Sequence, residues 1–235
     1  MVSEAGSRRA RARATRERIV ESAFRLMSEQ GYSATTLTAV AKDAGVAVQT
    51  IYFLFHSKPE LLRDAFAYAV QGDHTPVSPG ERTWFEKMRA EPNLPKALRI
   101  LIGAMVEIFR RASPLRSAFQ ALADDPETAA FHARGEQERH EGYGRILDAL
   151  SAKARLRPGL DRASATDLLF VLLSPEVYRE LVVGRGWPES KYADYMASLL
   201  GDSLFGSASM NIARGSSSNQ ERPVRRSRGP GVRVQ

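Results

Sequence analysis

Residues 36–52, TLTAVAKDAGVAVQTIY, carry the pattern that decides the fold. Thr36 can cap a short helix with the small residue Ala41 on its inner side, and Gly45 must end that helix, because glycine takes up the left-handed conformation that turns the chain sharply. A second short helix is predicted over 49–55. Two short helices joined through a glycine fit a helix-turn-helix, whose second helix can enter a major groove of DNA. An ordinary helical hairpin in an all-α core is the alternative.

A further helix is predicted on either side of this segment. Apolar residues recur at helical spacing over 15–30, with Thr15 as the N-cap. They do so again after Ser57, which has capping-box spacing to Glu60. We therefore expect an N-terminal domain over residues 15–72.

The rest of the chain also has the spacing of helices. A connection rich in turn-forming residues is expected at 71–81, followed by a second helical domain over 81–205. Apolar spacing and capping residues predict its helices over 95–111, 114–123 (after a Ser113 cap), 126–154 (after an Asp125 cap), 161–184 and 189–205. Proline at Ser174-Pro175 must kink or split the fourth of these. The predicted fold class is all-α.

The positive charge lies at the two ends of the sequence. Of the net charge of +7, residues 1–18 contribute +4 and residues 206–235 contribute +5, which leaves −2 for the part between them. Residues 1–14 are therefore interpreted as a flexible basic arm, and 206–235 as a disordered basic tail with too little apolar surface to fold. Basic ends suit a polyanion such as DNA, and a contribution to solubility alone is the alternative.

Composition excludes several functional classes. With no cysteine, the chain has no disulfides, thiolate chemistry or cysteine-bound zinc. No stretch reaches the ~18 consecutive apolar residues of a membrane helix, and no signal peptide is recognisable, so we expect a cytoplasmic protein without a membrane partner. Phosphate-binding glycine loops, nucleophile elbows and zinc-protease motifs do not occur. No cofactor is expected, and a helical enzyme is the less favoured alternative.

The helix-turn-helix and its surroundings resemble the DNA-binding domain of the TetR family of bacterial transcriptional regulators. The resemblance covers about residues 13–73. It rests on Thr36, Val40-Ala41, Ala44-Gly45-Val46, Thr50-Ile51-Tyr52, Phe55, Ser57-Lys58, Glu60 and Leu61. It implies a three-helix DNA-binding domain over 15–72, with the helix-turn-helix itself at about 36–55. It also implies a C-terminal domain that binds a small ligand and forms a homodimer.

The resemblance also implies which residues contact double-stranded DNA. These are Thr36, Thr38, Gln49, Thr50, Tyr52 and Lys58. Gln49 is the best candidate for direct readout of a base, and Lys58 is expected at a phosphate near a helix N-terminus. Structural alternatives exist: Thr36 as a cap only, Tyr52 as a core aromatic, and Lys58 as a solvated charge.

Two positions depart from the family pattern. Ala47 stands where a serine that can cap the recognition helix is frequent, and Leu54 stands where histidine is common. Both changes remove polar contacts to the DNA backbone. We hypothesise that the arginines between Arg8 and Arg18 compensate by reaching the duplex.

For the C-terminal domain, the resemblance implies dimerisation through about residues 163–205 and an effector pocket. Candidate pocket residues are aromatic or pliable side chains, most of which would be core in any helical protein. They are Phe66, Trp84, Phe85, Met88, Met105, Phe109, Phe119, Phe131 and Tyr143. The function implied is a ligand-responsive homodimeric repressor that releases a palindromic operator. A non-specific DNA-binding helical dimer, driven by its basic ends, is the alternative.

One further cluster has the spacing of metal ligands. His132, Glu136 and His140 lie four residues apart on one helix face. Because a single helix would supply every ligand and cysteine is absent, a solvated polar face is favoured and no metal is predicted.

Overall fold

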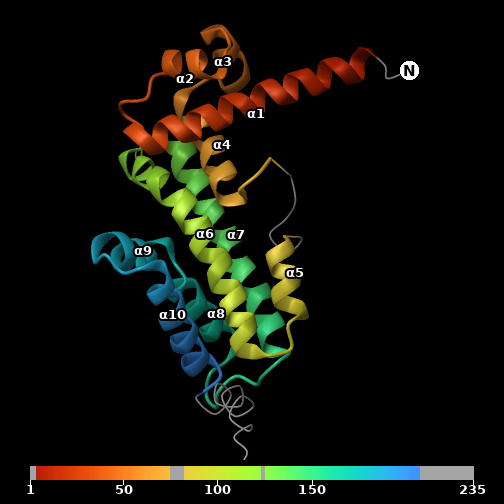
Figure 1. Cartoon of the computed structure of the whole chain (residues 1–235), viewed down its shortest axis with the longest axis vertical. Coiled ribbons are helices and arrows are strands. Elements are labelled where there is room, and N and C mark those ends of the chain that lie inside the picture. The colour runs from red at the N-terminus through yellow and green to blue at the C-terminus, as the bar shows by residue number, and fades with distance from the viewer. Residues whose placement is uncertain (1–3, 75–81, 123–124, 207–235) are drawn as a thin grey trace, which may run out of the picture.

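The computed structural model describes residues 4–74, 82–122 and 125–206 (Figure 1). The helices in these ranges are α1 (Glu4–Gln30), α2 (Leu37–Ala44), α3 (Val48–Phe55), α4 (Lys58–Gln71), α5 (Thr83–Ala90), α6 (Leu94–Ala121), α7 (Pro126–Ser151), α8 (Arg162–Leu172), α9 (Pro175–Tyr178), the π-helix η2 (Arg179–Gly184) and α10 (Glu189–Leu204). No strand occurs within them, so the all-α prediction is confirmed.

The molecule is elongated, with the helix-turn-helix at one end. Figure 1 shows α1, α2 and α3 gathered at this end, while α6 and α7 run side by side along the long axis. Helices α5, α8 and α10 pack around the other end of that pair. The long axis therefore connects the N-terminal helices to the C-terminal ones through α6 and α7.

Several helices begin at the N-cap residues that the sequence predicted. The Thr36 hydroxyl accepts a hydrogen bond from the backbone N–H of Ala39 at 3.0 Å, and Ser57 accepts one from Glu60 at 3.2 Å. Asp125 caps α7 by accepting from the N–H of Thr128 at 2.8 Å. Such caps satisfy donors that have no partner within the helix, each contributing about 1 kcal/mol.

Two helical boundaries differ from the predictions. Helix α1 begins at Glu4, so Thr15 is not its N-cap and residues 4–14 are helix rather than a flexible arm. The alternating arginines and alanines of this segment have high helix propensity, which extends the helix beyond the part that packs. Helix α6 runs unbroken through Pro114, where a new helix was expected.

Two hydrophobic cores explain why α6 tolerates its proline. One core joins α1–α4 to α6 through Ala112 and Leu115, and the other joins α5 to α10 through residues such as Leu98 and Phe109 of α6. Burying one such leucine contributes roughly 1.5–3 kcal/mol. Several buried side chains on each side of Pro114 therefore offset the roughly 3 kcal/mol that a proline costs inside a helix.

The predicted break at Ser174-Pro175 is confirmed. Helix α8 ends at Leu172, and the Ser174 side chain caps the short α9 by accepting from the N–H of Val177. A π-helix, η2, follows directly, and such irregular turns are frequent at functional sites. The last helix, α10, ends at Leu204, close to the prediction.

Some predictions fall partly or wholly outside the described residues. These are the first residues of the arm, most of the 71–81 connection and the 206–235 tail from 207 onward. Helix α5 was not predicted as a separate element.

Candidate nucleic-acid interface

The turn between α2 and α3 has the geometry that the sequence indicated. Gly45 has φ 66° and ψ 41°, in the left-handed region, and ends α2. The backbone N–H of Val46 then donates to the carbonyl of Ala41 at 2.9 Å and closes the turn. Since an L-residue at this φ would be strained, glycine is the residue the turn requires.

Helix α3 presents two different faces. Ile51 and Phe55 are fully buried against α1, α2 and α4, which anchors the helix to the domain. The side chains of Tyr52 and Phe53 are 53% and 79% exposed, and Gln49 is exposed as well. An exposed aromatic pair on a helix held this way forms a protruding edge, so the alternative of Tyr52 as a core residue is wrong.

Phe53 was missed in the sequence analysis. It lies next to Tyr52 and is the most exposed of the large apolar side chains in the described residues. Because Ile51–Phe55 is a continuous apolar run, its composition does not show which side of the helix faces the core. Ile51 and Phe55 share one face of the helix, so Phe53, midway between them, lies on the opposite face.

The remaining predicted contact residues lie around α2 and at the start of α4. Thr36 and Thr38 are exposed, Thr50 is half-buried, and the Thr36 hydroxyl also acts as the cap of α2. The ammonium group of Lys58 lies 4.2 Å from the centre of the Tyr32 ring and 3.5 Å from the carbonyl oxygen of Ser33. Partial burial lowers the pKa of Lys58. Lys58 is therefore more than a freely solvated charge.

The two positions that depart from the family pattern lie at the start and near the end of α3. Ala47 precedes α3 without any side-chain cap, as its methyl group dictates. The carbonyl of Leu54 accepts a hydrogen bond from Arg16 Nη1 at 3.0 Å. His56 ends α3 with φ 54°, a left-handed value uncommon outside glycine. The end of the recognition helix is thus fixed by α1 and by a sharp backbone turn.

Comparison with known proteins agrees with this geometry. Residues 19–65 match the family model for bacterial regulatory proteins of the tetR family. The N-terminal domain is thus of the TetR type. The chain is a DNA-binding transcriptional regulator of the helix-turn-helix type. It is similar to the uncharacterized HTH-type transcriptional regulator YdeS of Bacillus subtilis (strain 168), with 27% identity over 176 residues, 75% of this chain and 83% of YdeS.

Solved structures share the fold of this chain. A transcriptional regulator from Saccharomonospora viridis, crystallised in complex with choline, aligns with a TM-score of 0.63 at 16% identity, covering 80% of this chain and 96% of its own. The regulator FadR from Bacillus subtilis, in complex with stearoyl-CoA, aligns with a TM-score of 0.59 at 18% identity, covering 79% and 97%. Both alignments cover about four fifths of this chain.

The nine predicted pocket residues are divided between the two hydrophobic cores. Phe66, Phe119 and Phe131 belong to or pack on the N-terminal core, while the other six belong to or pack on the C-terminal core. Several are ordinary core residues: Met88 is fully buried, and the Tyr143 hydroxyl donates to the carbonyl of Leu173. The grouping into one pocket is therefore corrected, because α6 distributes these side chains between two separate cores.

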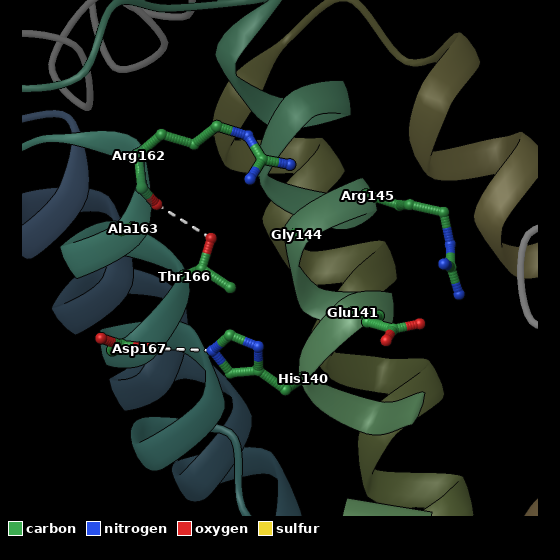
Figure 2. A pocket seen from close by; sticks show the side chains of 8 residues that line it. All are labelled: His140, Glu141, Gly144, Arg145, Arg162, Ala163, Thr166 and Asp167. Carbon is green, nitrogen blue, oxygen red and sulfur yellow. Dashed lines mark hydrogen bonds and ion pairs between the residues drawn. The ribbon is translucent and has the colours of Figure 1, made fainter. Parts of the chain in front are cut away.

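Two hollows on the described part of the surface are lined by other residues. The first, of about 370 Å³, lies between α7 and α8, where Figure 2 shows His140 pointing toward Asp167 while Glu141 and Arg145 point away from α8. The second, of about 360 Å³, lies between α6, α9 and η2 and is called the α6–α9 hollow. Its lining includes Arg110, Arg116, Glu176, Tyr178, Arg179 and Val183.

The suggested metal ligands are engaged elsewhere. Nε2 of His140 lies 2.9 Å from Oδ1 of Asp167, and Glu136 pairs with Arg139 at 2.7 Å. Among the described residues, no three potential ligands converge on a metal position. No helix within the same residues is both long and apolar enough to span a membrane.

Proposed function

We propose that this TetR-family protein is a ligand-responsive homodimeric repressor, acting in the cytoplasm, that binds a palindromic operator and releases it when a small effector binds the C-terminal helices. The observation that carries the proposal is the exposed pair Tyr52 and Phe53 on α3, held by the buried Ile51 and Phe55. A helix anchored on one side and bare on the other suits insertion into a major groove.

The roles assigned within the interface follow from residue chemistry. Gln49 can donate to and accept from an adenine edge, and Thr50 and Tyr52 lie beside it to contact bases or phosphates. Thr36, Thr38 and Lys58 flank the helix and would contact the sugar–phosphate backbone. Backbone contacts of this kind set the register of the protein, while contacts to base edges set specificity.

The dimer surface is assigned to residues 163–205. Three large apolar side chains of this segment are exposed in one copy: Val171 on α8 (57%), Val183 on η2 (67%) and Tyr195 on α10 (53%). Pairing of these helices with those of a second copy would cover them as part of a four-helix interface. Two-fold symmetry then places the half-sites about one helical turn, roughly 34–36 Å, apart.

We assign effector binding to the α6–α9 hollow. It lies at the level of Pro114, where α6 passes from one hydrophobic core to the other. Nε of Arg116 in this hollow donates to Oε1 of Glu176 at 2.7 Å, which links α6 to α9. An anionic group that competes with Glu176 for Arg116 would loosen this link and shift the part of α6 that packs on α1 and α4.

Selection from a random duplex library tests the DNA-binding part of the proposal. The expected result is a single two-fold symmetric sequence, protected as one discrete footprint by a dimer. Recovery of unrelated duplexes and uniform protection would instead support the non-specific DNA-binding dimer. Mass photometry of the free protein measures the dimer directly, and Val171→Glu, outside the α6–α9 hollow, should shift it toward monomer.

Effector binding is tested with two probes of opposite charge. Stearoyl-CoA and choline are bound by the solved relatives FadR and the Saccharomonospora viridis regulator. Since the α6–α9 hollow has three arginines and one glutamate, the anionic stearoyl-CoA should raise the Tm and choline should not. Arg179→Ala should weaken this effect, whereas Arg155→Ala, at an exposed site outside the hollow, should not. A response to choline alone would contradict the assignment.

A further inference from the structure

The arginine-rich beginning of α1 extends beyond the domain that α1 supports. Figure 1 shows the N-terminal half of α1 projecting past α2 and α3 into solvent. No side chain from Gly6 to Arg18 is buried, whereas Ile19 and Val20 are. Because residues 4–15 are helical, they form a rod about 18 Å long, at 1.5 Å per residue.

Arginines on this rod lie on two different faces. Arg9, Arg13 and Arg16 are four and three residues apart, so they share one face of the helix. Arg11 and Arg18 are seven residues apart and lie on the opposite side. Arg16 shows which way the Arg9–Arg13–Arg16 face points. Its guanidinium donates a hydrogen bond to the Leu54 carbonyl at 3.0 Å and lies 4.4 Å from the centre of the Phe55 ring. This face is therefore the side of α1 on which α3 packs.

We propose that Arg9 and Arg13 form a second DNA-binding element, which contacts phosphates of the duplex just outside each operator half-site. The inference rests on the proposed function, because α3 must first place the domain on DNA. The 18 Å rod starts near the end of α3 and extends away from it. Laid along a duplex, it would span roughly five base pairs at 3.4 Å each.

The charges on this face are available to a partner. Arg9 is exposed and forms no ion pair with the described residues, and Arg13 pairs only with Glu17, at 3.4 Å, with 78% of its side chain exposed. An exposed ion pair contributes little, so a phosphate can replace Glu17 at small cost. Double-stranded DNA is the partner that the position favours, because the face continues directly from the end of the recognition helix.

The helical rod can also replace the two contacts to the DNA backbone that the helix-turn-helix lacks. Ala47 and Leu54 have no side-chain group to offer a phosphate. Two arginines per protomer supply phosphate contacts outside the half-site instead. Such contacts are independent of sequence and depend strongly on salt, since each releases counterions from the duplex.

The test compares two double variants with the same loss of charge. In the full-length protein, Arg9→Ala/Arg13→Ala removes the face toward α3, and Arg11→Ala/Arg18→Ala removes the opposite face. Affinity is measured by fluorescence anisotropy at several salt concentrations on the selected operator, with flanks of six base pairs or none. A random-sequence duplex of the longer length is the third probe.

The Arg9/Arg13 variant should bind the flanked operator at least tenfold more weakly than the wild type, with a salt slope smaller by about 3 to 4 for a dimer. Trimming the flanks should weaken the wild type and leave this variant nearly unchanged. Arg11→Ala/Arg18→Ala should keep most of the wild-type affinity and slope. Equal losses in both variants, or no loss in either, would overturn the proposal.

Failure of the proposed function gives a different result. If the wild type shows no preference for any operator over random duplex, the regulator assignment fails. The difference between the two double variants can still be measured on the random duplex, so the inference about α1 is decided separately. Circular dichroism of both variants checks that α1 remains helical, as expected because alanine is the best helix former.

Discussion

Arg16 of α1 joins the end of the recognition helix to Asp64 of α4. Its Nη1 donates to the Leu54 carbonyl at 3.0 Å, and its Nη2 donates to Oδ2 of Asp64 at 2.5 Å. The guanidinium also lies against the ring of the buried Phe55. One side chain thus fixes the angle between α1, α3 and α4, and with it the direction in which Tyr52 and Phe53 point.

Arg16→Ala should therefore lower the stability of the domain. Loss of a carbonyl hydrogen bond and a cation–π contact predicts a decrease of about 1–3 kcal/mol in the free energy of unfolding. The ion pair with Asp64 adds little, because both side chains are about a third or more exposed. Urea denaturation measures the change. Arg18→Ala, an exposed residue without a pair in the described structure, should stay within about 0.5 kcal/mol of the wild type.

Phe53→Ala and Phe55→Ala should separate DNA binding from folding. Because Phe53 is 79% exposed, its removal should reduce operator affinity by tenfold or more with little change in unfolding free energy. Phe55 is fully buried, so Phe55→Ala should cost about 3–5 kcal/mol of stability. Anisotropy titration and urea denaturation of both variants provide the comparison. Wild-type operator affinity in Phe53→Ala would remove Phe53 from the interface.

Two buried tyrosines of the C-terminal core should respond oppositely to loss of their hydroxyl groups. The Tyr192 hydroxyl is buried without a hydrogen-bond partner among the described residues, whereas that of Tyr143 bonds the Leu173 carbonyl. Tyr192→Phe should leave stability unchanged or raise it by about 1 kcal/mol, and Tyr143→Phe should lower it by about 1 kcal/mol. Thermal and urea unfolding test the pair. A loss in Tyr192→Phe equal to that in Tyr143→Phe would show that the Tyr192 hydroxyl has a partner.

The same tyrosines predict a loss of stability in alkali. Burial raises the pKa of Tyr143 to about 12, and burial also raises the pKa of Tyr192. The unfolded chain releases these protons near pH 10, while the folded chain retains them. The contribution is therefore complete below pH 10 and decreases as the pH rises toward 12, by up to about 2–3 kcal/mol for Tyr143.

Urea midpoints between pH 8 and 11.5 measure this dependence. The wild type should lose stability above pH 10 more steeply than Tyr143→Phe, which no longer has that proton to release. Parallel curves for the two proteins would contradict the assignment of the alkaline loss to Tyr143. The measurement needs no operator and no effector, so it tests the packing of the C-terminal core alone.

Local signals in the sequence were sufficient to predict the helix-turn-helix. Thr36, Gly45 and Ser57 act through bonds to residues three or four positions away, so each can be read without knowing the fold. The break at Ser174-Pro175 is of the same kind. The positions of the basic segments along the chain could also be taken directly from the sequence, because arginine content does not depend on packing.

Tertiary structure decided what depends on contacts between distant residues. Pro114 lies within one helix because two cores hold α6 on both sides, and the aromatic residues expected in one pocket are divided between those cores. Neighbours in the sequence also differ: Phe53 is exposed and Phe55 buried, because Arg16 and the α1–α4 core fix the rotation of α3. Caps and turns depend on hydrogen bonds between residues close in the sequence, so the sequence predicts them. The burial of a side chain depends on contacts between residues far apart in the sequence, so only the tertiary structure shows it.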